Sequence, residues 1–186
     1  TFEEAMDRGD LVPQEELNRM AARVRPEDVC NMQYTSGTTG FPKGVMLTHK
    51  NLIANTMMCD AWMYKCNKGE EIILGILPFF HVYGMTTVLI LSVMQQGKMV
   101  LLPKFDAEQA LKTIDKQKPT LFPGAPTMYI GLLNHPDLKK YDLSTIKACL
   151  SGSAPLPLEV QEKFEAISGG RVVEGYGLTE TSPVTH

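Results

Sequence analysis

The sequence predicts an α/β fold with a largely parallel sheet flanked by helices. Strand-like apolar runs alternate along the chain with segments of helical periodicity, and this alternation is typical of parallel sheets. Residues 72–77 form an apolar run between Glu71 and Pro78, as expected for a strand that is covered on both faces. Residues 99–102 form a second run of the same kind.

Two elements and a lead-in segment are expected before the run at 72–77. Residues 29–34 are predicted to form a strand that ends in a Gly-rich loop, and residues 48–64 are predicted to form a helix. Residues 1–27 are expected to be an N-terminal lead-in segment, and residues 28–186 to belong to one domain. A chain of 186 residues, of which 44% are hydrophobic, is long enough to bury a sizeable core.

Helices and strands continue to alternate after the second run. Asp106 and Gln109 stand at capping-box spacing before a predicted helix that ends at Gln117. Residues 120–122 are a candidate short strand, and residues 126–133 are predicted to be helical. We therefore expect a further strand-to-helix unit in this region.

The last predicted elements are a strand at 146–150, a helix and a strand at 171–174. Pro157 suits the first turn of that helix, because proline lacks the N–H that a helix start leaves unbonded. Three apolar residues of the helix are expected to fall on one face: Val160, Phe164 and Ile167.

Charge and cysteine content exclude several classes of protein. The net charge of −3 and the pI near 5.8 leave no basic footprint, so nucleic acid is not an expected partner. The four cysteines form no close pair of the metal-binding kind: Cys30, Cys59, Cys66 and Cys149. We interpret them as the reduced thiols of a cytoplasmic protein.

The apolar segments do not predict a membrane protein. The most apolar stretch, residues 85–94, is shorter than the roughly 20 residues needed to span a bilayer. The N-terminus is acidic and lacks the apolar core of a secretory signal. Contact with a membrane is therefore expected to be at most peripheral, and the sequence leaves a homodimer open.

A Gly-rich stretch, YTSGTTGFPKG at residues 34–44, is the most informative feature of the chain. Glycines let the backbone approach a ligand closely, and successive N–H groups in such a turn form an anion-binding concavity. Hydroxyl groups and the Lys43 ammonium add further donors. The stretch therefore predicts a phosphate-binding loop.

Two alternative interpretations fit this stretch less well. The loop of P-loop NTPases requires a second glycine where Pro42 stands, counting from Gly37, and a hydroxyl residue where Gly44 follows the lysine. A solvated surface turn has no need for a lysine between Pro42 and Gly44. Neither alternative suits the stretch as well as a different phosphate loop.

Four ordered motifs resemble those of the adenylate-forming enzymes. Residues 34–49 (YTSGTTGFPKGVMLTH) are similar to the phosphate-binding signature of that superfamily, and three later segments follow in the same order: 78–84 (PFFHVYG), 151–156 (SGSAPL) and 174–180 (EGYGLTE). Residues 122–136 look most like medium- and long-chain fatty acyl-CoA synthetases. Because each motif follows a predicted strand, neighbouring strands would bring all four to one cleft.

The resemblance implies the roles of individual residues. Catalysis is expected of Lys43, His81, Thr179 and Glu180, with Glu180 as the magnesium ligand. The nucleotide is expected to contact Thr35, Ser36, Gly37, Thr38, Thr39, Gly40, Lys43, Ser153, Ala154, Pro155, Glu174, Gly175, Tyr176, Gly177, Leu178 and Thr179. The acid substrate is expected to contact His81, Val82, Tyr83, Gly84, Gly124, Thr127 and Gly152.

Two of these residues also allow other interpretations. Gly175-x-Gly177 invites a dinucleotide-binding interpretation, but Glu180 occupies the place of the third glycine. Within the resemblance, Tyr176 is instead the residue that stacks on adenine. A histidine beside Phe79 and Phe80 is commonly a hydrogen-bonded core residue, whereas the family context implies that His81 positions the substrate carboxylate.

The expected activity is that of a fatty acid–CoA ligase that uses ATP, Mg²⁺ and CoA. Residues 81–84 offer no carboxylate for the ammonium of an amino acid, so a fatty acid is the simpler substrate. The family's later elements are absent, so the chain is expected to be part of the large N-terminal domain, without the C-terminal lid domain, and inactive on its own. Two alternatives stay open: an acyl-AMP ligase that loads a carrier protein, and a non-catalytic nucleotide-binding module.

Overall fold

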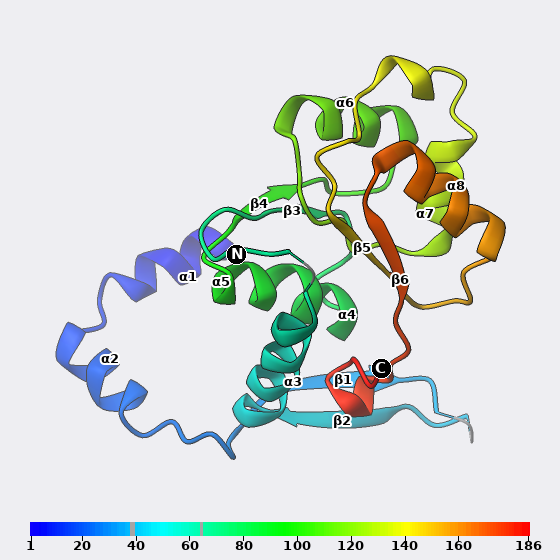
Figure 1. Cartoon of the computed structure of the whole chain (residues 1–186). Coiled ribbons are helices and arrows are strands. Elements are labelled where there is room, and N and C mark those ends of the chain that lie inside the picture. Colours follow the sequence, from blue (N-terminus) through cyan, green and yellow to red (C-terminus); the bar gives the residue numbers. More distant parts are fainter. Residues whose placement is uncertain (38–39, 64) are drawn as a thin grey trace.

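The computed structural model describes residues 1–37, 40–63 and 65–186 (Figure 1). Its centre is a parallel sheet in which β4 (Lys98–Leu101) pairs with β3 (Ile72–Gly75), and β5 (Ala148–Ser151) pairs with β6 (Arg171–Glu174). Parallel bridges at Leu121 join β3 to β5, so the spatial order is β4, β3, Leu121, β5, β6. The predicted α/β fold and its parallel sheet are confirmed.

Helices cover both faces of this sheet, as predicted. On one face lie α6 (Ala107–Gln117), α7 (Pro126–Leu133) and α8 (Leu158–Ser168), as Figure 1 shows. Their core centres on Tyr129, whose ring meets those of Phe122 and Phe164 edge-to-face at centroid distances of 5.3 and 5.1 Å. Such pairs are favourable beyond their buried area.

The predicted apolar face of α8 is correct only in part. Phe164 is 1% exposed and Val160 packs against the core, but Ile167 remains 45% exposed. The capping prediction for α6 is confirmed in one direction, because the Asp106 side chain accepts a hydrogen bond of 2.8 Å from the Gln109 N–H. Pro157 stands at the N-cap of α8, one position before the predicted first turn.

The other face of the sheet is covered by a helical segment that the sequence analysis did not predict. It runs from α4 (Val82–Gly84) through a π-helix (Met85–Ile90) into α5 (Leu91–Met94). Val88 and Leu91 are fully buried there against Ile73 and Leu121. The most apolar stretch of the chain is therefore core, and no helix in the described ranges is long and apolar enough to cross a membrane.

The strand predicted at 29–34 exists, but it does not belong to the parallel sheet. β1 (Val29–Thr35) pairs antiparallel with β2 (Lys43–Thr48), which was not predicted, in a hairpin that lies apart from the sheet (Figure 1). The prediction missed β2 because its first residues belong to the Gly-rich motif. In the hairpin register Thr35 lies opposite Lys43.

Helix α3 (His49–Trp62) follows β2 directly. The Thr48 side chain caps it by accepting a hydrogen bond of 3.1 Å from the Asn51 N–H. The predicted helix was to continue to Tyr64, which lies outside the described residues. Short 3₁₀ turns occupy Leu138–Lys140 and Thr179–Thr181.

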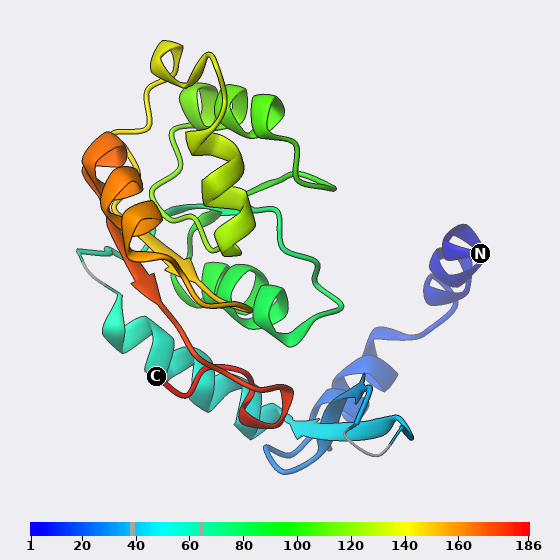
Figure 2. The same ribbon diagram turned by 90° about the vertical axis from the view of Figure 1, so that its right-hand side faces the viewer.

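The N-terminal segment forms two amphipathic helices, α1 (Phe2–Gly9) and α2 (Gln14–Ala21). Neither helix has a buried residue, and Figure 2 shows them extending away from the body of the structure. That residues 1–27 are a lead-in and 28–186 one domain remains a prediction.

Candidate active site

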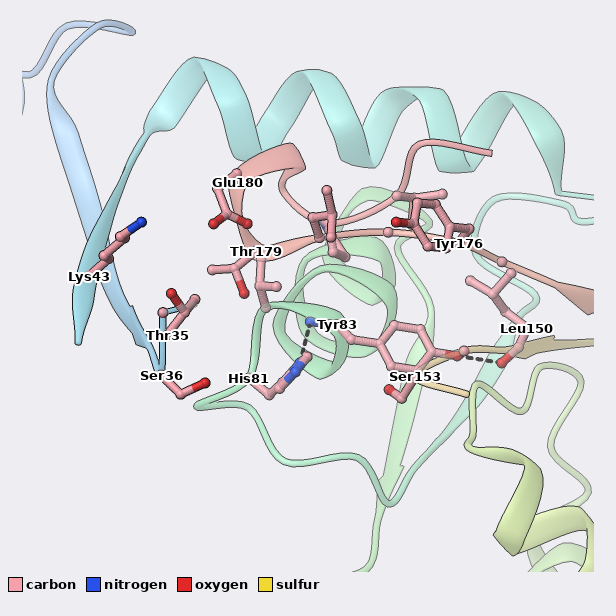
Figure 3. Close-up of a pocket in the computed structure, with 18 residues that line it drawn as sticks. Thr35, Ser36, Lys43, His81, Tyr83, Leu150, Ser153, Tyr176, Thr179 and Glu180 are labelled. Atoms are coloured by element: carbon pink, nitrogen blue, oxygen red, sulfur yellow. Dashed lines mark hydrogen bonds between the residues drawn. The ribbon is translucent and has the colours of Figure 1, made fainter. Parts of the chain in front are cut away.

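A pocket of about 530 Å³ lies where the four sequence motifs meet (Figure 3). The β1–β2 hairpin contributes the phosphate-loop residues, and the loop after β3 contributes His81 and its neighbours. The ends of β5 and β6 contribute the other two motifs. The expected convergence therefore occurs, although β1 reaches the pocket from a hairpin rather than from the parallel sheet.

Most of the predicted site residues line this pocket. Of the nucleotide and catalytic predictions, these line it: Thr35, Ser36, Gly37, Lys43, His81, Ser153, Gly175, Tyr176, Gly177, Leu178, Thr179 and Glu180. Of the predicted acid contacts, Val82, Tyr83 and Gly152 also line it. This proximity makes a common ligand feasible, whereas the individual roles remain predictions.

Other predicted residues lie elsewhere. These are not among the lining residues: Gly40, Gly84, Gly124, Thr127, Ala154, Pro155 and Glu174. Gly84 has a packing reason for being glycine, since a Cβ there would lie 2.5 Å from the Pro78 carbonyl oxygen. Thr38 and Thr39 lie outside the described residues.

The pocket also has lining residues that the sequence analysis missed: Leu150, Pro183 and Val184. Leu150 could have been found, because it ends the strand that leads into the Ser151 motif. Pro183 and Val184 lie beyond the last motif, and no local pattern marks them. An antiparallel bridge between Gly177 and Val184 brings Pro183 and Val184 back to the pocket.

The predicted phosphate loop lies at the end of the β1–β2 hairpin, between Thr35 and Lys43. Gly37 has φ +64°, and a Cβ there would lie 2.5 Å from the Phe41 carbonyl oxygen, so only glycine fits. Because Thr35 pairs with Lys43 across the hairpin, a hydroxyl and an ammonium flank the mouth of the loop. Figure 3 shows the Lys43 side chain extending toward the side where Thr179 and Glu180 lie.

His81 is held in one orientation at the start of α4. Its Nδ1 accepts a hydrogen bond of 3.1 Å from the Tyr83 N–H, which leaves Nε2 as the proton-bearing nitrogen of the neutral ring. The Val82 N–H donates to Gln33 Oε1 at 3.0 Å, which ties this segment to β1. The imidazole is exposed and lines the pocket, so the core-residue interpretation of His81 is wrong.

Tyr83 is a structural link as well as a lining residue. It is 7% exposed, and its hydroxyl lies 2.5 Å from the Leu150 carbonyl oxygen and 3.2 Å from that of Gly124. Burial raises the pKa of this phenol well above its ordinary value. Gly152 packs closely on this residue, because a Cβ would lie 3.0 Å from the Tyr83 ring and the ring would have to shift to make room for it.

Thr179 and Glu180 stand on a 3₁₀ turn after β6, with Tyr176 just before it. The Tyr176 ring is exposed, and its nearest aromatic neighbour is His186, at a centroid distance of 5.5 Å. Among the described residues, neither Lys43 nor Glu180 forms an ion pair. Their charges are thus open to a ligand.

The donor set of the pocket fits a nucleoside triphosphate with magnesium. Hydroxyl groups, a positive-φ glycine and Lys43 suit phosphates, and the ring of Tyr176 suits a base. The described part of the chain holds no group of three or more His, Cys, Asp or Glu that could bind a metal by itself. One carboxylate, Glu180, suits Mg²⁺, which takes few protein ligands and is bound largely through phosphates and water.

Comparison with known proteins identifies the family. Residues 2–186 match the family described as AMP-binding enzyme, and the chain belongs to it. It is 64% identical over 165 residues to the long-chain-fatty-acid–CoA ligase of Bacillus subtilis (strain 168), covering 88% of this chain and 30% of that protein. It is also 40% identical over 170 residues to the putative acyl-CoA synthetase YngI of the same organism, covering 91% of this chain and 31% of the relative.

Solved structures agree with this assignment. The ATP-bound crystal structure of MatB from Rhodopseudomonas palustris superimposes with a TM-score of 0.73 at 34% identity, covering 86% of this chain and 31% of that one. The chain thus spans about 30% of the length of the relatives that it matches.

Proposed function

We propose that this chain is the ATP-binding part of a fatty acid–CoA ligase that forms AMP and pyrophosphate through an acyl-adenylate. The observation that carries the proposal is the single pocket in which the phosphate loop, His81, Ser153 and the Thr179–Glu180 turn meet. The relative that is 64% identical is a long-chain-fatty-acid–CoA ligase, which supports a fatty acid as the substrate.

In this proposal the phosphate loop binds the β- and γ-phosphates. Thr35 and Ser36 offer hydroxyl donors, and Lys43 offers a positive charge. The pyrophosphate that leaves carries most of the charge that develops, so fixed donors at this place lower the barrier. The ATP bound to MatB supports ATP as the nucleotide of this pocket as well.

The Thr179–Glu180 turn serves the other end of the triphosphate. Thr179 contacts the α-phosphate, and Glu180 holds a magnesium ion, which supplies charge neutralisation when bound. Tyr176 lies three residues earlier, on the same side of the pocket, where its ring can stack on adenine. Ser153 forms the wall opposite to it.

His81 positions the fatty carboxylate. Its Nδ1 is occupied by the Tyr83 N–H, so the ring offers its Nε2–H to the pocket. The carboxylate attacks the α-phosphate to give the acyl-adenylate and pyrophosphate. The CoA thiolate then displaces AMP to give the thioester.

We also propose that the enzyme works in the cytoplasm, with membrane contact that is at most peripheral. The support is chemical: none of the described cysteines is in a disulfide, which suits a reducing compartment. Burial raises the pKa of the Cys59 thiol to about 11, so this thiol stays protonated at neutral pH.

The exchange of radiolabelled pyrophosphate into ATP tests the proposed function. The intact protein is incubated with ATP, magnesium, labelled pyrophosphate and acids of increasing chain length, and thioester formation is followed after CoA is added. We expect exchange only when a fatty acid is present, followed by acyl-CoA formation. Exchange without any acid, or none with any fatty acid, would overturn the assignment.

A further inference from the structure

We propose that Asn55, a buried residue of helix α3, is a positioning residue that holds the Thr179–Glu180 turn in register with the phosphate loop. The inference rests on the proposed function of the pocket. Asn55 does not line the pocket, and none of the sequence motifs includes it. Its importance follows from its hydrogen bonds alone.

Three hydrogen bonds connect the Asn55 amide to the chain beyond Glu180, and a fourth, of 3.9 Å, comes to its Oδ1 from the Cys59 thiol of the same helix. Its Nδ2 donates to the Val184 carbonyl oxygen at 2.7 Å and to that of Thr181 at 3.2 Å. Its Oδ1 accepts a hydrogen bond of 3.2 Å from the Val184 N–H. Asn55 is 3% exposed, so these bonds are shielded from water. No other side chain of this size supplies two donors and an acceptor.

Helix α3 connects this amide to the phosphate loop without an intervening linker. β2 begins at Lys43, and its last residue, Thr48, is the N-cap of α3, so Asn55 lies in the second turn of the helix. Figure 2 shows the C-terminal segment lying along α3, and Figure 3 shows the same helix beside the turn that carries Thr179 and Glu180.

The turn itself is closed by its own hydrogen bonds, so Asn55 acts on its placement. The Leu178 N–H is bonded to the Thr181 hydroxyl and to the Pro183 carbonyl oxygen, each at 3.0 Å. A second attachment comes from the π-helix, where the buried Thr86 hydroxyl donates to the Ser182 carbonyl oxygen at 3.0 Å. Asn55 and Thr86 thus hold the turn from two different elements.

The placement matters because no direct bond connects the two charged groups of the pocket. In the described structure Lys43 and Glu180 share no ion pair, so their separation depends on the elements that carry them. A misplacement of about 1 Å at a reacting centre costs on the order of a hundredfold in rate. Loss of the Asn55 bonds should therefore lower turnover more than it lowers stability.

The test uses two variants in the intact protein whose side chains have the same number of heavy atoms as asparagine. Asn55→Leu removes all three hydrogen bonds to the C-terminal segment, and Asn55→Asp keeps, of these three, only the acceptor for the Val184 N–H. Met58→Ala, at an exposed position of the same helix, is the matched control. For each protein we would measure thermal unfolding, the hydrogen exchange of the Val184 amide and fatty-acid-dependent pyrophosphate exchange.

We expect both Asn55 variants to stay folded at the assay temperature and to lower the kcat of pyrophosphate exchange by about tenfold or more. The KM for the fatty acid should change little, the magnesium requirement should rise, and the Val184 amide should exchange faster in Asn55→Leu. Met58→Ala should match the wild type in each respect.

Three results would overturn the inference, and they differ in whether the proposed function of the pocket is refuted as well. A faster-exchanging Val184 amide with unchanged kcat would leave the proposed function intact and refute positioning. An unchanged Val184 amide in Asn55→Leu would refute the attachment itself. No acid-dependent exchange in the wild type would refute the proposed function, and the inference with it. If Asn55→Leu fails to fold, Asn55→Asp decides by its kcat, because it loses the two donated bonds and keeps the acceptor for the Val184 N–H: an unchanged kcat in Asn55→Asp would refute positioning.

Discussion

The hydroxyl of Tyr83 lies 2.5 Å from the carbonyl oxygen of Leu150, and this hydrogen bond joins two motifs that are 67 residues apart. Tyr83 belongs to the segment that carries His81, whereas Leu150 lies in β5, one residue before Ser151, where that strand ends and the Ser151 motif begins. The same hydroxyl lies 3.2 Å from the Gly124 carbonyl oxygen. One buried tyrosine thereby connects three strand ends around the pocket.

Replacing this tyrosine by phenylalanine should be tolerated at a modest cost. The Leu150 carbonyl keeps hydrogen bonds from the Gly124 N–H and the Tyr129 hydroxyl, so Tyr83→Phe should lower the free energy of unfolding by about 1 kcal/mol. Urea unfolding measures this, with Tyr34→Phe, at an exposed position, as the control. A loss no larger than that of Tyr34→Phe would show that the hydroxyl does not hold these strand ends together.

The aromatic core under α8 should be far more sensitive. Phe164 is fully packed against Tyr129, so Phe164→Ala should cost about 3–5 kcal/mol through lost burial and a cavity. Ile167→Ala, one turn further along the same helix at a half-exposed position, should cost less than about 1 kcal/mol. Equal losses for the two variants in chemical denaturation would contradict the observed packing of α8.

An ion pair lies at the opposite end of the sheet from the pocket. Glu71, which is 1% exposed, accepts hydrogen bonds from Lys147 Nζ and the Asn67 N–H, each at 2.8 Å, and from the Thr120 hydroxyl. Although burial alone would raise the pKa of Glu71, these hydrogen bonds and the Lys147 charge hold it below the ordinary value of 4.5.

The sign of the resulting pH dependence follows from this lowered pKa. A carboxyl group with a lowered folded-state pKa stabilises the protein above pH 4.5, and that contribution is lost as the pH falls through the folded-state pKa. Glu71→Gln should therefore lower the free energy of unfolding by about 2 kcal/mol at pH 7 and by less at pH 3. Denaturation of both proteins at the two pH values is the measurement, and a pH-independent difference would refute the account.

The parallel sheet could be predicted because its strands are encoded locally. The apolar runs before Pro78 and around Val100 are short and bounded by polar or turn residues, although only the first is buried, because β4 is partly exposed, with Leu101 52% exposed. The helix cap at Asp106 is likewise a local signal. In these segments, the local pattern and the tertiary environment favour the same structure.

The elements that were missed depend on contacts between distant residues. β2 is a strand only because β1 pairs with it, and its first residue, Lys43, also belongs to the predicted phosphate loop. The stretch 85–94 has no amphipathic period because the sheet and α3 bury most of it. The role proposed for Asn55 could not be predicted, since its partners near the Glu180 turn lie 126 and 129 residues away.

Lys43 should affect ATP more than the acid. Lys43→Ala removes the charge proposed to face the β- and γ-phosphates, so we expect the KM for ATP in pyrophosphate exchange to rise by about tenfold or more while the KM for the fatty acid stays within about twofold. Lys104→Ala, at an exposed position outside the pocket, is the control. An unchanged KM for ATP with a raised KM for the fatty acid would contradict the assignment of the loop.

The most direct test of the account is the magnesium dependence of adenylation in Glu180→Gln, compared with Glu162→Gln on the exposed side of α8. The substitution at Glu180 removes no core volume, so the variant should keep the thermal stability of the wild type. We predict that fatty-acid-dependent pyrophosphate exchange falls by about a hundredfold or more at limiting magnesium, while Glu162→Gln behaves like the wild type. Near-normal exchange by Glu180→Gln at limiting magnesium would show that the pocket does not bind Mg·ATP through Glu180.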